Sequence, residues 1–116
     1  MIELKELRLE QNQIKSIEAM HNYPNLVELW LSNNPISMIF PDAFAQVKSL
    51  NTLVIDDVKF RWPREDLIFL KKVANTLTRL SLNRAFPKEN LESIEELPQL
   101  HMPELDELSL RQVGLL

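Results

Sequence analysis

The leucines of this chain recur with a regular spacing. Residues 4–14 follow the pattern LxxLxLxxNxI, residues 26–36 repeat it without a departure, and looser copies start at residues 50, 77 and 105. In each copy the central LxL places two leucines on one side of a short strand, because side chains alternate along a strand. One coil cannot bury its leucines alone, so the pattern predicts a stack of about five coils around a shared core.

The repeated motif resembles that of the leucine-rich-repeat family, closely in the first two copies and more loosely in the last three. The resemblance implies an α/β fold, a right-handed leucine-rich-repeat solenoid with a curved parallel β-sheet on its concave face and short helices on its convex face. We expect a single domain over residues 1–116, with repeats starting near residues 4, 26, 50, 77 and 105.

Two asparagines of the motif have a role implied by the resemblance. Asn12 and Asn34 stand where the family carries an asparagine ladder, in which the side-chain amide pairs with turn backbone groups that would otherwise be buried without a partner. Val58, Ala85 and Val113 occupy the equivalent positions of the later copies. We therefore expect less regular turns from the third coil onward.

The connectors between the strand motifs lengthen toward the C-terminus. The first connector, residues 15–25, carries apolar residues at short helical spacing, whereas residues 64–75 and 87–97 have the pattern of amphipathic helices. The apolar positions of the helix over 64–75 are Leu67, Leu70, Val73 and Ala74. Helices on the convex side are wider than strands, so we expect the solenoid to bend more in its C-terminal half.

Both ends of the chain lack the polar cap that a solenoid needs. The sequence starts close to its first leucine and ends on the apolar run Val113 to Leu116. We expect the C-terminal face to be covered by further residues of a longer chain, by a second copy in end-to-end self-association, or by a partner chain.

The strand register also predicts which side chains face the solvent on the concave sheet. They are residues 6, 8 and 10, 28, 30 and 32, 52, 54 and 56, 79, 81 and 83, and 107, 109 and 111. Trp30 is the unusual member of this set, since a large aromatic residue at a sheet centre is typical of a protein interface. The alternative is that Trp30, with Arg8 and Val54 as lateral neighbours, is covered by stacking of Arg8 and binds nothing.

We take this face as the candidate partner-binding site. The residues proposed for it are Arg8, Glu28, Trp30, Val54, Asp56, Arg79, Asn83 and Arg111. Acidic residues gather in the first three coils and basic residues in the last two, which would orient a partner of opposite polarity. The alternative is an ordinary mixed surface exposed to solvent.

Other chemistry finds little support in the sequence. The net charge of -4 and pI near 5.2 disfavour nucleic acid, and the absence of cysteine excludes thiolate metal sites. His21 and His101 lie in different connectors without catalytic or ligand spacing, and a single glycine excludes a glycine-rich phosphate loop. Trp62 between Arg61 and Arg64 could stack on a nucleotide, but covering the convex edge of the sheet is favoured. We expect no enzyme activity, no cofactor and no metal.

Together these patterns favour a non-catalytic protein–protein interaction module with a regulatory, scaffold or substrate-recognition role. The alternative is a structural repeat block of a larger leucine-rich-repeat protein, such as an immune sensor, a ubiquitin-ligase receptor or a bacterial effector. The sequence has neither an N-terminal signal pattern nor an apolar run long enough to span a membrane, and we expect no membrane partner. We expect a cytoplasmic protein, with the nucleus as the second compartment.

Overall fold

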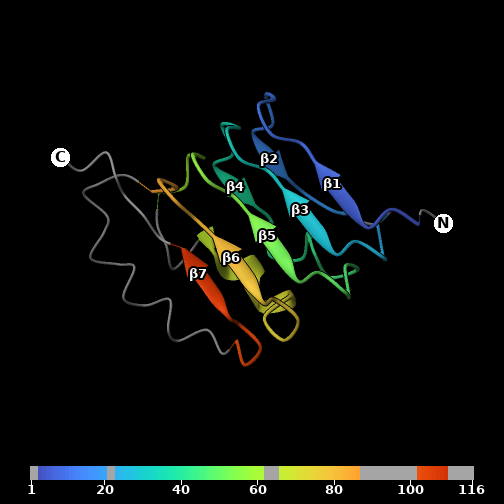
Figure 1. The fold of residues 1–116 in the computed structure, drawn as a ribbon. Coiled ribbons are helices and arrows are strands. Elements are labelled where there is room, and N and C mark those ends of the chain that lie inside the picture. The colour runs from blue at the N-terminus through green and yellow to red at the C-terminus, as the bar shows by residue number, and fades with distance from the viewer. Residues whose placement is uncertain (1–2, 21–22, 62–65, 87–101, 110–116) are drawn as a thin grey trace.

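The computed structural model describes residues 3–20, 23–61, 66–86 and 102–109. These residues form a parallel β-solenoid whose main sheet has five strands in the order β1-β3-β5-β6-β7 (Figure 1). Each strand is three residues long, because the chain turns away from the sheet after every leucine motif. The strands are β1 (Glu6–Arg8), β3 (Glu28–Trp30), β5 (Thr52–Val54), β6 (Arg79–Ser81) and β7 (Glu107–Ser109).

The strands pair in the register that the leucine spacing predicts. Leu7 lies opposite Leu29, Leu29 opposite Leu53, Leu53 opposite Leu80, and Leu80 opposite Leu108. The column is fully buried in its middle, where Leu29 and Leu53 are 0% exposed, and it opens at its end, where Leu108 is 47% exposed. A leucine in the middle is covered by coils on both sides, as expected for a stack in which each coil completes its neighbour.

A second, two-stranded sheet lies on the opposite side of the first two coils. It pairs β2 (Ser16–Ile17) with β4 (Met38–Ile39) in parallel, and Ile17 and Ile39 point into the core. The apolar residues that the sequence places at short helical spacing in the first connector include Ile17 and Met20, and both are buried. The described part of this connector forms a short strand and no helix. Two connectors of nearly equal length stack in register, so their backbones can pair with each other.

Between the main sheet and the connectors lies a core that includes four phenylalanines. Phe44 meets Phe69 edge to face with ring centroids 5.4 Å apart, and Phe60 lies 6.3 Å from Phe69 and 5.6 Å from Phe86. All four side chains are at most 5% exposed. These rings fill the space on the connector side of the second to fourth coils.

The continuous helix predicted over residues 64–75 is wrong in its described part. Ile68–Lys72 form a 3-10 helix, η1, and residues 73–76 form turns. Leu67, Leu70 and Val73 are buried at a spacing of three, which matches the three residues per turn of a 3-10 helix better than the wider turn of an α-helix. Helices are thus nearly absent from the described residues, and the α/β character of the expected fold is not confirmed.

Several other predictions fall outside the described residues. They concern the helix over 87–97, the residues Trp62, Arg64, His21 and His101, and the apolar C-terminal run. Stronger bending of the C-terminal half depends on those helices and stays a prediction.

Candidate protein-binding face

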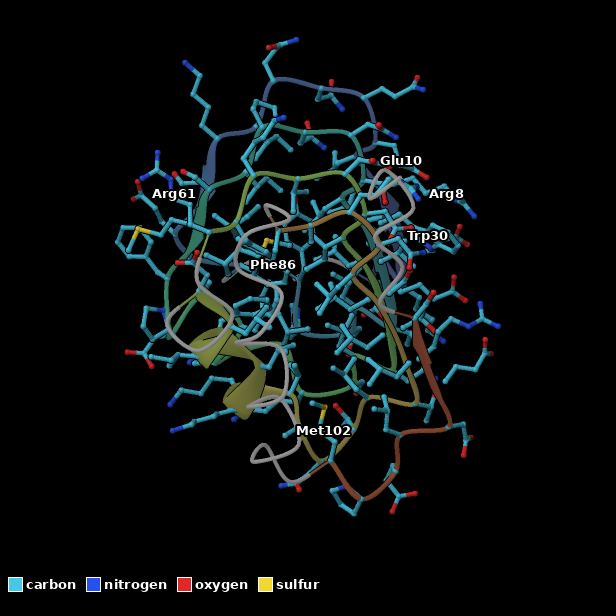
Figure 2. All side chains as sticks on the ribbon, turned by 90° about the vertical axis from the view of Figure 1, so that its left-hand side faces the viewer. Arg8, Glu10, Trp30, Arg61, Phe86 and Met102 are labelled. Carbon is cyan, nitrogen blue, oxygen red and sulfur yellow. The ribbon has the colours of Figure 1, made fainter. Side chains whose placement is uncertain are left out.

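The side chains that point away from the core on β1, β3, β5, β6 and β7 form one surface, which we call the outer sheet face. Figure 2 shows Arg8, Glu10 and Trp30 on this face, Arg61 on the opposite side of the molecule, and Phe86 between them. The outer sheet face is the one that the sequence analysis expected to be concave. Val54 and Thr52 point outward in β5 but are only 6% and 7% exposed, so neighbouring side chains cover the middle strand.

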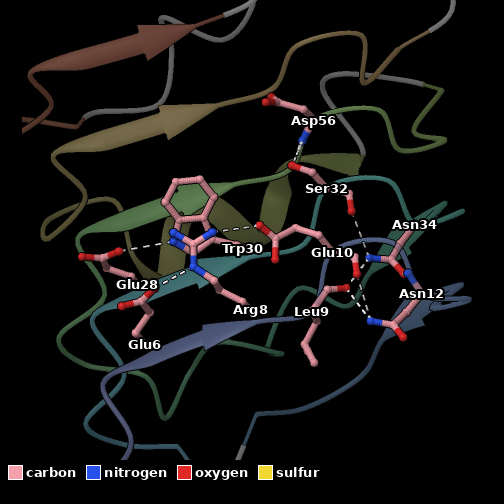
Figure 3. Close-up of polar contacts among 10 residues, drawn as sticks. All are labelled: Glu6, Arg8, Leu9, Glu10, Asn12, Glu28, Trp30, Ser32, Asn34 and Asp56. Carbon is pink, nitrogen blue, oxygen red and sulfur yellow. Dashed lines mark hydrogen bonds and ion pairs between the residues drawn. The ribbon is translucent and has the colours of Figure 1, made fainter.

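Trp30 is held in place by a network of charged side chains (Figure 3). The guanidinium carbon of Arg8 lies 4.1 Å from the centroid of the indole, and the indole Nε1–H donates to a carboxylate oxygen of Glu28 at 3.2 Å. Arg8 in turn donates to Glu6 at 2.7 Å and to Glu10 at 3.1 Å. The Arg8 stacking that the sequence left as an alternative is therefore present, although Trp30 remains half-buried rather than covered.

The two carboxylates also act on the charge of Arg8. The hydrogen bond to Glu6 is the main reason why the pKa of Arg8 lies above its usual range, and the charge and hydrogen bond of Glu10 add to it. An arginine is charged throughout the ordinary pH range, so a positive charge lies over the indole at neutral pH.

Next to Trp30, the outer sheet face is hollowed over β5, β6 and β7. The hollow has a volume of about 240 Å³. It is lined by Trp30, Val54, Asp56, Arg79, Leu80, Ser81, Glu107 and Ser109. Trp30 forms its wall on the β3 side, and Arg79 contacts Glu107 across the last two strands, with a guanidinium nitrogen 3.2 Å from a carboxylate oxygen.

Four of the eight residues predicted for the site line this hollow: Trp30, Val54, Asp56 and Arg79. Arg8 and Glu28 contact the indole without lining the hollow, Asn83 belongs to a hydrogen-bond network beneath it, and Arg111 lies outside the described residues. The list of proposed site residues omitted four lining residues, Leu80, Ser81, Glu107 and Ser109. The strand register had placed Ser81, Glu107 and Ser109 on this face, whereas nothing in the sequence marks Leu80.

Asn34 forms the asparagine ladder that the resemblance implied. Its Oδ1 accepts the backbone N–H of Asn12 at 3.0 Å and that of Ile14 at 3.2 Å, and its Nδ2 donates to the carbonyls of Leu9 at 2.8 Å and Leu31 at 3.0 Å. A fifth bond runs from Nδ2 to the carbonyl of Ser32 at 3.4 Å, and the side chain is 2% exposed, so Asn34 pairs five backbone groups in a buried turn. Asn12 is exposed and binds only carbonyls of its own turn.

The later coils, in which the ladder position is apolar, pair their turns from the outer sheet face instead. The Asp56 backbone N–H donates to Ser32 Oγ at 3.0 Å, and the Asn83 N–H donates to Asp56 Oδ1 at 2.7 Å. The hydroxyl of Ser81 also donates to Asp56 Oδ1 at 2.7 Å, and that of Ser109 donates to Asn83 Oδ1 at 2.8 Å. We call Ser32, Asp56 and Asn83, together with these two serines, the outer polar ladder.

Both ladders lie beside a turn of constant geometry. Gln11, Asn33, Asp57 and Arg84 occupy the same place in four successive coils, and all four have a positive φ of 54–61°. Only asparagine and aspartate adopt this left-handed conformation readily among non-glycine residues. The turns that begin at Gln11 and Arg84 therefore carry a conformational cost that packing of the coils has to offset.

Arg84 and Asp57 form an ion pair between neighbouring turns. Arg84 donates from Nε and from a terminal nitrogen to the two oxygens of Asp57, at 2.7 and 3.0 Å. The hydrogen bond of Arg84 is the main cause that lowers the pKa of Asp57, and burial opposes it. Each side chain remains about a third exposed or more, so the pair lies at the surface.

The described charges of the outer sheet face do not form a simple gradient from acidic to basic. Arg79 and Arg84, the described arginines of the fourth coil, each pair with a carboxylate, and Glu107 adds an acidic group to the last strand. This arrangement supports the alternative of a mixed surface, with an excess of carboxylates near Trp30.

Within the described residues, no cluster of histidine, aspartate or glutamate has the grouping that a metal ion needs, and no helix has the length and apolar character needed to cross a membrane.

The described residues thus form a solenoid whose outer sheet face carries a hollow beside Trp30. Residues 2–46 match the family model described as leucine rich repeats (2 copies), and this part of the chain is therefore similar to leucine-rich-repeat proteins. The match covers less than half of the 116 residues. No curated protein and no solved structure matches the chain. Domains of this family generally mediate protein–protein interactions and are typically non-catalytic.

Proposed function

We propose that the chain is a non-catalytic interaction module that binds a protein partner through the outer sheet face, in a regulatory, scaffold or substrate-recognition role. The observation that carries this proposal is the hollow beside the half-buried Trp30. The proposal takes residues 1–116 as one solenoid domain of five coils, of which the family match covers the first two. It places the protein in the cytoplasm or nucleus, as expected from a sequence without cysteine.

Trp30 is suited to anchor a partner. Tryptophan is enriched among the few interface residues that carry most of the binding energy, and such anchors lie near the centre of the interface. Strand β3 is flanked by β1 on one side and by β5 on the other. Because Arg8 and Glu28 already fix the indole, a partner would order few additional side chains on binding, and this lowers the entropic cost of association.

The proposal can be tested by selection of binders from a displayed library of protein fragments, followed by affinity measurements with purified components. We expect Trp30→Ala to weaken the selected binders at least about tenfold, the size typical of an interface anchor. Met38→Ala is the matched control, since Met38 is a large apolar residue that is 45% exposed on β4, away from the outer sheet face.

Thermal unfolding is the control for stability. The unfolding temperatures should be similar for the wild type and both variants, since neither side chain belongs to the core. Binders that tolerate Trp30→Ala and are lost with Met38→Ala would show that the binding surface lies on the connector side. That result would overturn the assignment of the binding site to the outer sheet face.

The alternative role, a structural block within a larger solenoid, is favoured by one observation. The leucine columns open at both ends of the described sheet, where Leu4 is 37% and Leu108 is 47% exposed. Size-exclusion chromatography with light scattering distinguishes the roles. A stable monomer of 13.6 kDa supports an independent module, whereas a mass that rises with concentration supports end-to-end self-association or a missing neighbour.

A further inference from the structure

Two carboxylates beside Trp30 form no ion pair among the described residues, although the charge of Asp56 acts on Arg84 outside ion-pair distance. Glu6 and Glu10 bind Arg8, and Glu107 binds Arg79. Glu28 accepts only the neutral indole N–H, and Asp56 accepts only a hydroxyl and a backbone N–H, among the hydrogen bonds of the described residues. All of the accepted bonds of Asp56 fall on Oδ1, so within the described part of the chain its second oxygen is available to a ligand.

The neutral polar groups of the hollow have already used their hydrogens. The indole N–H of Trp30 goes to Glu28, the hydroxyl hydrogen of Ser81 goes to Asp56, and that of Ser109 goes to Asn83. A serine hydroxyl has one hydrogen and two lone pairs. Ser81 already accepts from Nδ2 of Asn83 at 3.2 Å, so one lone pair of Ser81 is left, and further contacts of Ser81 and Ser109 are made as acceptors. The charge of Arg79 is balanced by Glu107. The hollow is therefore rich in acceptors, and a donor group fits it best.

The shape of the hollow limits the size of that donor. Sites that take whole small molecules measure roughly 300–1,000 Å³, and this hollow measures about 240 Å³. Its wall and floor include Trp30, Val54 and Leu80, which suit an aliphatic stem, and Asp56 supplies a charge at its edge. Lysine and arginine combine an apolar stem with a charged head in this way.

We infer that the hollow receives a lysine or arginine side chain from a basic segment of the partner, with its stem against Trp30 and Val54 and its cation at Asp56. The protein contains one example of the same chemistry, because Arg8 lies over the indole and between two carboxylates. The net charge of -4 would attract a basic segment from a distance. This inference rests on the proposed function and names the chemistry of the partner at that site.

The test is an NMR titration of the full chain with two capped tripeptides, one with a central arginine and one with a central citrulline, the neutral analogue of arginine. We expect the arginine peptide to shift the signals of the Trp30 indole and the Val54 and Ser81 amides in a saturable manner. Removal of the positive charge in citrulline should weaken binding about tenfold. Equal responses to the two peptides, or shifts that gather elsewhere, would overturn the inference.

Asp56→Asn removes the carboxylate charge while keeping the hydrogen bonds that stabilise the fold. The asparagine Oδ1 can still accept the bonds from Ser81 and Asn83, so the outer polar ladder is retained. We expect this variant to bind the arginine peptide about tenfold more weakly. Asp42→Asn is the matched control, because it removes the same charge from a carboxylate that lies away from the hollow and pairs with Lys72. Equal loss in both variants would mean that net charge alone attracts the peptide.

Failure of this inference can be told apart from failure of the proposed function. If library binders depend on Trp30 but carry no basic residue whose replacement weakens them, the binding face stands and the cationic occupant is wrong. If no binder depends on Trp30, the proposed function itself fails.

Discussion

The first two coils and the next two supply hydrogen bonds to the backbone groups of their turns from opposite sides of the sheet. Between coils one and two, the buried amide of Asn34 pairs five backbone groups from the interior. In coils three and four that position holds Val58 and Ala85, both buried in the core, and the backbone N–H groups of Asp56 and Asn83 are paired on the outer sheet face, by Ser32 and Asp56 respectively. Turns in both regions need hydrogen-bond partners, and the side of the sheet that supplies them differs.

This difference has a consequence for function. Because Asn34 pairs the first turns from the interior, the outer face of coil two contributes only Ser32 to the outer polar ladder, and Trp30 there can be large and aromatic. The outer polar ladder instead places a carboxylate, an amide and hydroxyls on the surface of coils three and four, directly beside Trp30. The candidate site lies at the boundary between these two regions. Its aromatic wall, Trp30, comes from coil two, and its polar lining comes from the later coils.

The leucine column is common to both regions, and a change in it should have the largest effect. Leu53 is 0% exposed at the centre of the sheet, and Leu53→Ala leaves a cavity that should lower the free energy of unfolding by about 4 kcal/mol. Leu108→Ala at the 47% exposed end of the same column should cost about 1 kcal/mol or less. Urea unfolding measures both, and equal losses would mean that the end of the column is covered as well as its centre.

Removal of the interior ladder should come next. Asn34→Ala leaves the N–H groups of Asn12 and Ile14 and the carbonyls of Leu9 and Leu31 with one partner fewer in a buried turn, which should cost about 3 kcal/mol. Asn12→Ala removes bonds of an exposed side chain to its own turn and should cost about 1 kcal/mol or less. Chemical denaturation of the two variants compares them, and a larger loss for Asn12 would place the ladder in the wrong coil.

These features differ in how far the sequence predicts them. Leucine spacing predicts the five strands and their register, because a period-two alternation with one buried face leaves a single pairing that buries every leucine. The prominence of Trp30 and its contact with Arg8 follow from the same register. Four of the residues that line the hollow were predicted on this basis.

The rest depends on packing that no local pattern reveals. Ile17 and Ile39 form a second sheet because two connectors of nearly equal length stack on each other, and the helical spacing of either connector alone says nothing about its neighbour. Residues 68–72 tighten into a 3-10 helix because Phe69 packs against Phe44 and Phe60. The outer polar ladder was missed because Ser32, Asp56 and Asn83 look like ordinary surface residues until the coils are stacked.

The outer polar ladder can be tested by comparing two changes at one residue. Asp56→Ala removes the acceptor of the Asn83 N–H and the Ser81 hydroxyl, and should lower the free energy of unfolding by about 2 kcal/mol. Asp56→Asn keeps an oxygen in place and should cost much less. Thermal and urea unfolding report the difference. Equal losses for the two variants would show that the carboxylate charge, rather than the hydrogen bonds, stabilises these turns.

The smallest effect is expected at the turn next to this ladder, and it should depend on pH. Arg84 lowers the pKa of Asp57 below its ordinary value of 3.8, so the charged form of Asp57 stabilises the fold above that value, and this stabilisation is lost as the pH falls through the lower folded pKa. Asp57→Asn removes the charge and keeps a side chain that tolerates the positive φ of 56°. The pair is partly exposed, so the wild type should exceed the variant by a small margin at neutral pH, and high salt should reduce it. The margin should fade below about pH 4 in thermal unfolding. A margin that persists in strong acid would mean that Asp57 stabilises the turn through its shape and hydrogen bonds instead of its charge.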